Sequence, residues 1–446
     1  MGIAWNLIST IFNQGSTLVV NLWIASTLGQ HRFGEYAIVL GTVQVASLVA
    51  NLGLGYTAAR YMAELRVVDR ARAGRVLALC ALLAATAAIS MWASLGLLAP
   101  LLADRLYQAP HLTPLIRWGS GVAAAMIVNG LLNGVLAGLE SYRSLAWIGF
   151  VSGVIYFTAC AAFGRIWGLE GVLIGMCVAA VLQSCLLLVA ARSALRRHGI
   201  RPVWRGLHDE RRVVLHFAIP AALAGAITPV SFWLGQAILV RQPGGYDQVA
   251  LYAAAFNLMS AVLLLPSVAN NVGMSLLNSV RGGGDPRQFR WVFRRNLLLT
   301  AAFVGAGALG TLLLSPWLLG LYGPSFRAAL PALAILLAGV LFESFSMAAN
   351  QMLQSRERMW QAMRVLVLPR DALLPIGALL LAPLYGARGL ALAYLASRIT
   401  GFGCTAAAVR RIWRDGGRLT REPSDPPPSA AGREPMAGAP QETGGA

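Results

Sequence analysis

The sequence predicts an all-α polytopic membrane protein with about twelve transmembrane helices. Hydrophobic residues make up 57% of its 446 residues and charged residues only 12%, whereas a soluble domain carries about 25% charged residues. The mean hydropathy is +0.63. The apolar residues form successive runs of about 20, the length that crosses about 30 Å of hydrocarbon. These three observations exclude a chain of soluble domains.

The apolar runs follow one another with short polar interruptions up to about residue 409. Glycine and ionised residues end the runs, because both interrupt a helix that faces lipid. The first run lacks the basic start and the cleavage site of a signal peptide, so we expect it to remain as a helix. The predicted helices cover residues 3–28, 36–58, 75–99, 115–138, 145–164, 171–192, 214–240, 249–276, 297–320, 328–353, 363–384 and 389–409.

Arginine supplies every basic side chain, since none of the 36 basic residues is lysine. The loops on one side of the predicted helices, with the helix ends beside them, hold 28 arginines, among them Arg370, and those on the other side hold seven; only Arg398 lies in the middle of a predicted helix. The positive-inside rule therefore places the arginine-rich loops and both termini in the cytoplasm. This distribution explains the net charge of +18 without a nucleic acid partner.

Three short segments recur 215 to 218 residues later in the same order, which indicates an internal repeat. Each repeat holds about six helices, so a pseudo-two-fold axis along the membrane normal relates two lobes, and transporters bind substrate at such a seam. We expect an N-terminal six-helix lobe (1–195), a cytoplasmic connection (196–212), a C-terminal six-helix lobe (213–412) and a disordered cytoplasmic tail (413–446). The paired landmarks are Tyr36 and Tyr252, Tyr107 and Tyr322, and Gly168 and Gly386.

The reactive residues do not form a catalytic pattern. The five cysteines are scattered singly, without a CxxC motif, so neither a metal site nor a disulfide framework is expected. The absence of lysine excludes a P-loop ATPase. The predicted exoplasmic loops are too short to build an active site. We therefore expect a transporter without cofactor or metal, and not an enzyme.

Polar residues inside the apolar runs provide the remaining signal. Several recur at heptad or i,i+4 spacing and so share a helix face. For each amide two interpretations stay open: hydrogen bonding between helices, worth ~0.6 kcal/mol, or lining of a hydrated cavity. Stripes on corresponding helices of both halves favour a shared cavity. The candidate substrate-contacting residues are Asn13, Gln14, Asn21, Gln44, Asn51, Arg60, Asn129, Asn257, Asn270, Glu343, Asn350 and Arg398.

Glu343 and Arg398 are ionised residues in the middle of predicted helices. An unpaired charge at that depth costs about 2.5–3.5 kcal/mol, so such groups pair or face water. We predict that they lie close enough to interact, within the C-terminal lobe and facing the cavity between the lobes. Two roles stay open: Arg398 attracts an anionic cargo that Glu343 restrains, or the two form a fixed structural ion pair.

The order of motifs resembles one family of transporters. N-x6-NQ in the first helix, LGQHRFGEYA, NLGLGYTAARYMAE before a basic loop, and LAGLESYR resemble Wzx-type polysaccharide-biosynthesis flippases of the multidrug/oligosaccharidyl-lipid/polysaccharide exporter superfamily. The likeness covers residues 1–412. It implies a V-shaped cavity between two lobes in the bacterial inner membrane, lined by cationic residues for which Arg60, Arg117 and Arg398 are candidates.

The resemblance also implies a substrate. Such flippases transfer an undecaprenyl-diphosphate-linked oligosaccharide, a repeat unit of O-antigen, capsule or exopolysaccharide, from the cytoplasmic to the periplasmic leaflet. Membrane lipid and polysaccharide polymerase machinery would then be partners. Two alternatives stay open: a cation-coupled drug antiporter of the same superfamily, and an integral-membrane glycan polymerase or ligase. The first helix lacks the acidic residue of the cation-coupled exporters, and short exoplasmic loops oppose an enzyme.

Overall fold

The computed structural model describes residues 2–210, 219–282, 286–354 and 367–414. Every regular element in these ranges is a helix, so the predicted all-α class is confirmed. Seven helical stretches within them have the length and composition to cross a membrane. The exact number of crossings and the division into two six-helix lobes stay predictions.

The first half of the chain forms a group of five long helices, which we call the N-terminal group. Short π- or 3-10-helical turns at Leu102–Leu106 and Pro110–Leu112 connect the third helix to the fourth, and another turn, Leu207–Glu210, follows the fifth. The long helices are α1 (Gly2–Ala50), α2 (Leu54–Val68), α3 (Arg70–Leu101), α4 (Thr113–Gly138) and α5 (Tyr142–Arg197).

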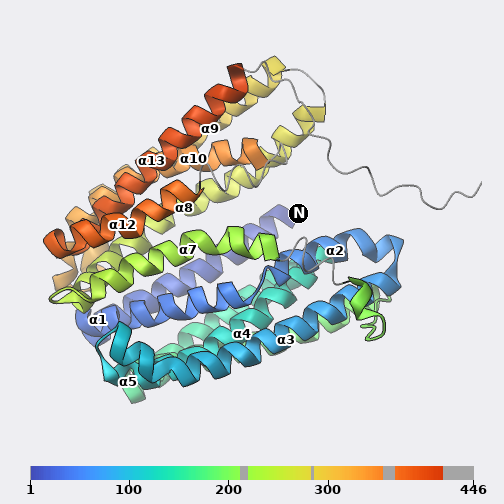
Figure 1. The fold of residues 1–446 in the computed structure, drawn as a ribbon, viewed down its shortest axis with the longest axis horizontal. Helices are drawn as coiled ribbons and strands as arrows, with labels where there is room; N and C mark the ends of the chain where they lie inside the picture. Colours follow the sequence, from blue (N-terminus) through green and yellow to red (C-terminus); the bar gives the residue numbers. More distant parts are fainter. Residues whose placement is uncertain (1, 211–218, 283–285, 355–366, 415–446) are drawn as a thin grey trace, which may run out of the picture.

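The second half forms the C-terminal group. In Figure 1, α1–α5 occupy the lower part of the view and α8–α13 the upper part, with α7 running between them beside α1. The two groups converge toward the left of this view and diverge toward the right. The helices are α7 (Ile219–Val240), α8 (Gly245–Gly282), α9 (Pro286–Tyr322), α10 (Leu330–Gln354), α12 (Leu368–Tyr385) and α13 (Ala387–Arg414), with a 3-10 turn at Pro324–Ala329.

Two long helices contain a break where the sequence predicts a loop between helices. The backbone of α1 leaves the helical region at Gly29, with φ of 84°, and that of α5 does so at Trp167 and Gly168. A further break corrects the prediction of one continuous helix over 36–58. Leu52 and Gly53 take left-handed φ values of 49° and 65°, and an α-helix cannot continue through two such residues.

The landmarks of the internal repeat adopt matching local structures. Tyr36 and Tyr252 are both fully buried. Gly168 and Gly386 have φ values of 60° and 57°, a left-handed conformation that favours glycine. The correspondence of side-chain burial and backbone conformation supports the repeat that the sequence spacing predicts.

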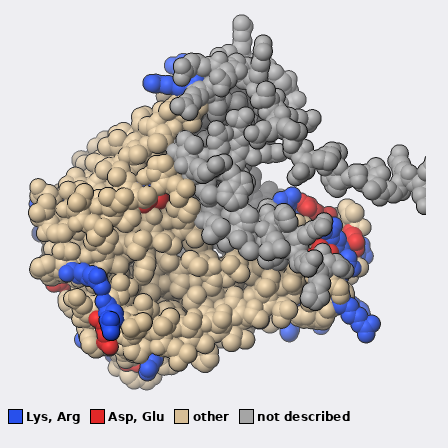
Figure 2. Space-filling view, in the orientation of Figure 1, with Lys and Arg blue, Asp and Glu red and all other residues tan. Residues whose placement is uncertain are grey.

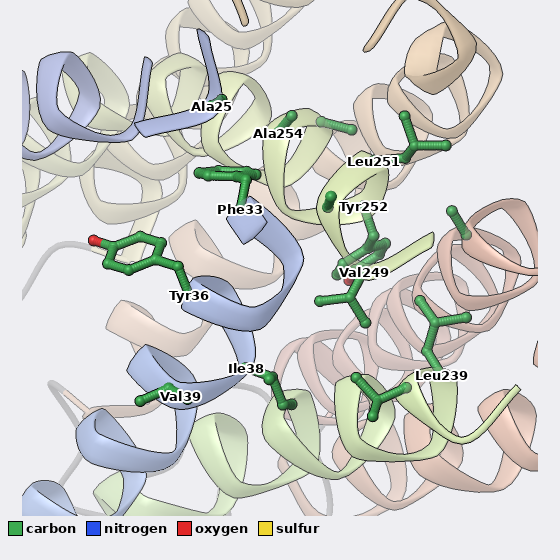
Figure 3. Packing of buried hydrophobic residues seen from close by; sticks show 14 of the residues in the cluster. Ala25, Phe33, Tyr36, Ile38, Val39, Leu239, Val249, Leu251, Tyr252 and Ala254 are labelled. Atoms are coloured by element: carbon green, nitrogen blue, oxygen red, sulfur yellow. The ribbon is translucent and has the colours of Figure 1, made fainter. Parts of the chain in front are cut away.

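The predicted exoplasmic turns gather at one end of the molecule, which we call the crest end. One hydrophobic core cluster joins the two groups there. Figure 3 shows Phe33 and Ile38 of α1 close to residues of α7 and α8. The ring of Phe33 also packs edge-on against Tyr322 and Phe326, with centroids 5.9 and 5.7 Å away. Such aromatic pairs are worth about 0.5–1.5 kcal/mol each beyond their buried area.

Backbone contact and polar bonds close the crest end. Gly34 of α1 lies against the carbonyl oxygen of Tyr246 at the start of α8, with no room for a Cβ atom. The Gln30 amide donates to the carbonyl oxygen of Asp247 over 3.2 Å. The Arg241 guanidinium donates to the carbonyl oxygen of Arg105 over 2.7 Å. The two groups are therefore fastened together at this end.

Several of the arginine-rich turns gather at the opposite end, which we call the basic end. Arg66 pairs with Glu140 at 2.5 Å, and Arg72 pairs with Glu210 at 3.0 Å. Figure 2 shows charged side chains toward the ends of this face and a broad, largely uncharged band between them. Large apolar side chains such as Leu313 and Leu380 are exposed. Such a surface suits lipid and not water.

Candidate functional site

A buried ion cluster lies inside the C-terminal group. Arg398 of α13 places its Nε 2.6 Å from Oε2 of Glu343 on α10. The predicted proximity of these two residues is confirmed. The backbone hydrogen bonds of α10 and α13 hold the Cα atoms of Glu343 and Arg398 in place. The long Arg398 side chain extends from α13 to Glu343 on α10. Whether the pair faces a cavity between the groups, and whether it touches substrate, stay predictions.

Two further residues complete the ion cluster and were missed in the sequence. Arg370, predicted as a loop arginine, lies in the first turn of α12 and is only 15% exposed. Its Nε lies 2.8 Å from Oδ1 of the neighbouring Asp371, and its Nη1 lies 3.6 Å from Oε1 of Glu343. Asp371 also lies 3.6 Å from Nη1 of Arg398. The cluster thus contains two guanidinium groups and two carboxylates.

The sequence predicts a loop at Arg370 because Pro369 and Arg370 follow other arginines, a pattern that is typical of a cytoplasmic turn. Proline at the first helical positions is also a helix-start signal, and here α12 begins at Leu368. The signal that could have identified the cluster is Asp371, an acidic residue at the edge of an apolar run. A carboxylate in that place needs a basic partner.

The Arg398 guanidinium is buried and retains bonding capacity. The side chain is 2% exposed, and its carbon lies 4.6 Å from the ring centroid of Tyr394 and 5.3 Å from that of Phe232. Within the described part of the chain, its Nε and Nη1 have no aligned hydrogen-bond acceptor. The contact to Glu343 is therefore an ion pair without hydrogen-bond geometry. A guanidinium of this kind can still donate to an oxyanion.

Helix α7 connects the ion cluster to the N-terminal group. Thr228 of α7 donates to Oδ2 of Asp371 over 2.5 Å and accepts from Nη2 of Arg370 over 2.9 Å. On the same helix, Trp233 donates from Nε1 to Oγ1 of Thr42 on α1 over 3.1 Å. A displacement of α7 relative to α1 would therefore reach the cluster through a single helix, in which Pro229 lies between the two residues.

A second feature is a pocket of about 180 Å³ between α1, α4 and α5, which we call the amide pocket. Two predicted site residues, Gln44 and Asn129, line it together with Gln183. The Asn129 amide donates to Oε1 of Gln183 over 3.3 Å and accepts from Oγ of Ser184 over 2.7 Å. Ser152 also lines the pocket, and its hydroxyl is buried without a hydrogen-bond partner in the described residues.

The remaining predicted residues lie elsewhere. Asn51 lines a separate groove of about 440 Å³ that also touches Gly225 of α7. Arg60 is half exposed at the basic end and pairs with Glu64, one turn further along α2, over 2.9 Å. Asn21 is buried in α1, and Asn257 is half-buried in α8. The side chains of Asn13, Gln14, Asn270 and Asn350 lie outside the described residues.

The predicted site thus separates into charged and uncharged parts. Glu343 and Arg398 belong to the ion cluster, while Gln44 and Asn129 belong to the amide pocket. Among the described residues, no group of three or more histidine, cysteine or acidic side chains could hold a metal ion. The chemistry that this arrangement supports is binding by guanidinium, amide and hydroxyl groups.

Comparison with known proteins gives one family and two named relatives. Residues 1–273 match the family described as polysaccharide biosynthesis protein. The chain is 24% identical over 361 residues to the EPS I polysaccharide export inner membrane protein EpsE of Ralstonia solanacearum, covering 76% of this chain and 81% of that protein. It is 20% identical to the protein of the same name from Ralstonia nicotianae, covering 79% and 80%.

Solved structures show the same fold. An inward-facing multidrug resistance MATE family transporter of the MOP superfamily aligns with a TM-score of 0.76 at 14% identity, covering 93% of this chain and 99% of that one. An outward-facing structure aligns with a TM-score of 0.70 at 15% identity, covering 93% and 96%. A MOP superfamily transporter from Pyrococcus furiosus, described as having a binding pocket of reverse polarity, aligns with a TM-score of 0.70 at 14% identity, covering 92% of this chain and 95% of that one.

Proposed function

Because this chain belongs to the polysaccharide biosynthesis protein family of the MOP superfamily, we propose that it is a lipid-linked oligosaccharide flippase. In this proposal it transfers an undecaprenyl-diphosphate-linked repeat unit from the cytoplasmic to the periplasmic leaflet by alternating access. The two EpsE relatives, which are named polysaccharide export inner membrane proteins, support the bacterial inner membrane as its location. They also support transport and not catalysis.

The observation that carries the proposal is the buried ion cluster. A charge in a bilayer costs about 2.5–3.5 kcal/mol by insertion scales, and here two arginines and two acids are kept together. Guanidinium groups match phosphate oxygens with two parallel hydrogen bonds. The cargo diphosphate would take the Arg398 donors, and Glu343 would reclaim that guanidinium when the cargo leaves.

The crest end supplies the second part of the mechanism. At the crest end, α1 packs directly against α8. Helix α7 bonds to α1 through Trp233 and to the ion cluster through Thr228. In the proposed cycle, opening the crest breaks these contacts and shifts α7. The shift would change the position of Thr228 against Asp371 and so the geometry that the cluster offers to the diphosphate.

Arg60 is proposed to meet the diphosphate as it enters. Both Arg60 and its partner Glu64 are 51% exposed. An exposed pair of this kind contributes only about 0–1 kcal/mol. Releasing Glu64 in favour of a doubly charged phosphate group would therefore cost little.

The function is tested by deleting the gene and following the lipid-linked glycan. We expect glycan export to stop and the undecaprenyl-diphosphate-linked repeat unit to accumulate, since its synthesis on the cytoplasmic leaflet continues without transfer. The full-length chain should restore export. Drug susceptibility is measured in the same strains, because the alternative antiporter shares the fold with MATE transporters. Increased susceptibility with normal glycan export would contradict the flippase and favour the antiporter.

The orientation is tested by thiol labelling of intact cells, using a variant without the five native cysteines. We expect Pro243→Cys, in the turn between α7 and α8, to react with an impermeant reagent, and Ser429→Cys in the tail to be protected. Pro243 is exposed, whereas the adjacent Gly244 has φ of 65° and suits only glycine without strain. Labelling at 429 with protection at 243 would show the inverted topology.

A further inference from the structure

We propose that the amide pocket binds an uncharged sugar residue of the cargo, separately from the diphosphate. This inference rests on the proposed function and extends it by giving the glycan its own binding site. The pocket lies in the N-terminal group and the ion cluster lies in the C-terminal group. The two parts of one polar headgroup, a sugar and a diphosphate, would then contact different helix groups.

The side chains around the pocket carry neutral hydrogen-bonding groups and no ionised group. Amides and hydroxyls both donate and accept, which is the requirement for sugar hydroxyls. The carboxylates that are typical of a cation site and the guanidinium or ammonium groups that are typical of an anion site are not among its lining residues. The polar residues that line it are Ser16, Thr17, Gln44, Asn129, Ser152, Tyr156 and Gln183.

The polar groups are arranged for a ligand as well as for packing. The Asn129 side chain donates a hydrogen bond to Oε1 of Gln183. The NH₂ group of Gln183 therefore points away from Asn129. The buried Ser152 hydroxyl has no partner among the described residues. A buried polar group without a hydrogen bond costs about 1–3 kcal/mol, so a ligand hydroxyl at this position would remove an existing penalty.

The size of the pocket selects a single sugar ring. An apolar cavity of about 150 Å³ admits a benzene molecule, and the amide pocket measures about 180 Å³. It therefore admits one six-membered ring with its hydroxyls and excludes a whole repeat unit. Tyr156 and Met176 provide apolar surface beside the polar groups, which suits the C–H face of a sugar.

The test compares two lipids on the purified full chain in nanodiscs: undecaprenyl diphosphate, and the same lipid carrying glucose or N-acetylglucosamine. We expect at least one sugar-bearing lipid to bind about tenfold more tightly than the bare lipid, the effect of one or two well-made hydrogen bonds. Gln44→Met should abolish this preference and leave affinity for the bare lipid unchanged. Gln44 is exposed in the pocket, so its replacement does not disturb the core.

Gln183→Met is the second variant, and Gln242→Met is the matched control. The Gln242 amide bonds within its own helix end, to the carbonyl oxygen of Ile238, and should keep the preference. Equal binding of the three lipids by the wild type, or a preference that survives both pocket variants, would overturn the sugar site alone. Failure of every lipid to bind would overturn the flippase proposal and the sugar site with it.

Discussion

Replacing Arg398 with methionine is expected to destabilise the folded protein by about 3–5 kcal/mol and to abolish glycan export. Removing one partner of a buried ion pair leaves the other charge uncompensated, and that penalty sets the magnitude. Here one guanidinium, that of Arg370, would be left to compensate two carboxylates: Glu343, which is 16% exposed, and Asp371, which is 1% exposed. Thermal unfolding in detergent and the cellular protein level measure the stability, and surface glycan measures the export.

The double variant Arg398→Met with Glu343→Met separates structure from function. It removes both charges of the pair and keeps the pair of Arg370 with Asp371, which are 2.8 Å apart. We expect protein level and melting temperature to recover while export stays absent. Recovery of export would show that the pair is a structural ion pair without contact to cargo.

Arg66→Met is the matched control for the loss of an arginine. Arg66 is 19% exposed, but its partner Glu140 is 61% exposed and remains solvated when Arg66 is lost; ion pairs that are open to solvent contribute about 0–1 kcal/mol. This variant should therefore keep both stability and export. A loss comparable to that of Arg398→Met would show that burial does not account for the effect.

A charge swap between Glu343 and Arg398 does not separate the two roles of the pair. The swap would place a new guanidinium beside Arg370, which lies 3.6 Å from Glu343, and a new carboxylate beside Asp371, which lies 3.6 Å from Arg398. Two like-charge contacts would arise in a buried site. We therefore expect the swapped protein to fold poorly in either role of the pair.

Gly34→Ala is expected to prevent closure of the crest end and to lower glycan export at normal protein level. A Cβ at this position would overlap the Tyr246 carbonyl oxygen, a backbone atom that cannot rotate away. Overpacking costs about 1–3 kcal/mol. This penalty lowers the equilibrium constant for closing the crest end by about 5–150-fold. Cross-linking of His31→Cys with Asp247→Cys reports closure, because these side chains lie 3.5 Å apart.

Gly15→Ala is the control on the same helix, since a Cβ there meets no atom within 4 Å. Cross-linking and export should remain at the wild-type value in this variant. Undiminished cross-linking in Gly34→Ala would show that the crest accommodates the extra carbon by a small helix shift. In that case the close approach of α1 and α8 would not gate transport.

The sequence determined the all-α class and the approximate positions of the long helices, because spanning a bilayer imposes length and apolarity on each segment. It also determined the landmarks of the repeat, since Gly168 and Gly386 occupy left-handed turns that favour glycine. These are local requirements that a run of about 20 residues or a single backbone conformation can satisfy. The position of Glu343 and Arg398 within their helices likewise sufficed to predict their pairing.

Only the tertiary structure decided how the polar residues are grouped. Residues as far apart in the chain as Thr228, Asp371 and Arg398 meet because α7, α12 and α13 pack side by side. Gln44 and Gln183 share a pocket for the same reason, whereas Asn51, one heptad from Gln44, lies in another groove beyond the end of α1. Spacing along a helix fixes a face, but which side chains that face meets depends on the packing of the other helices.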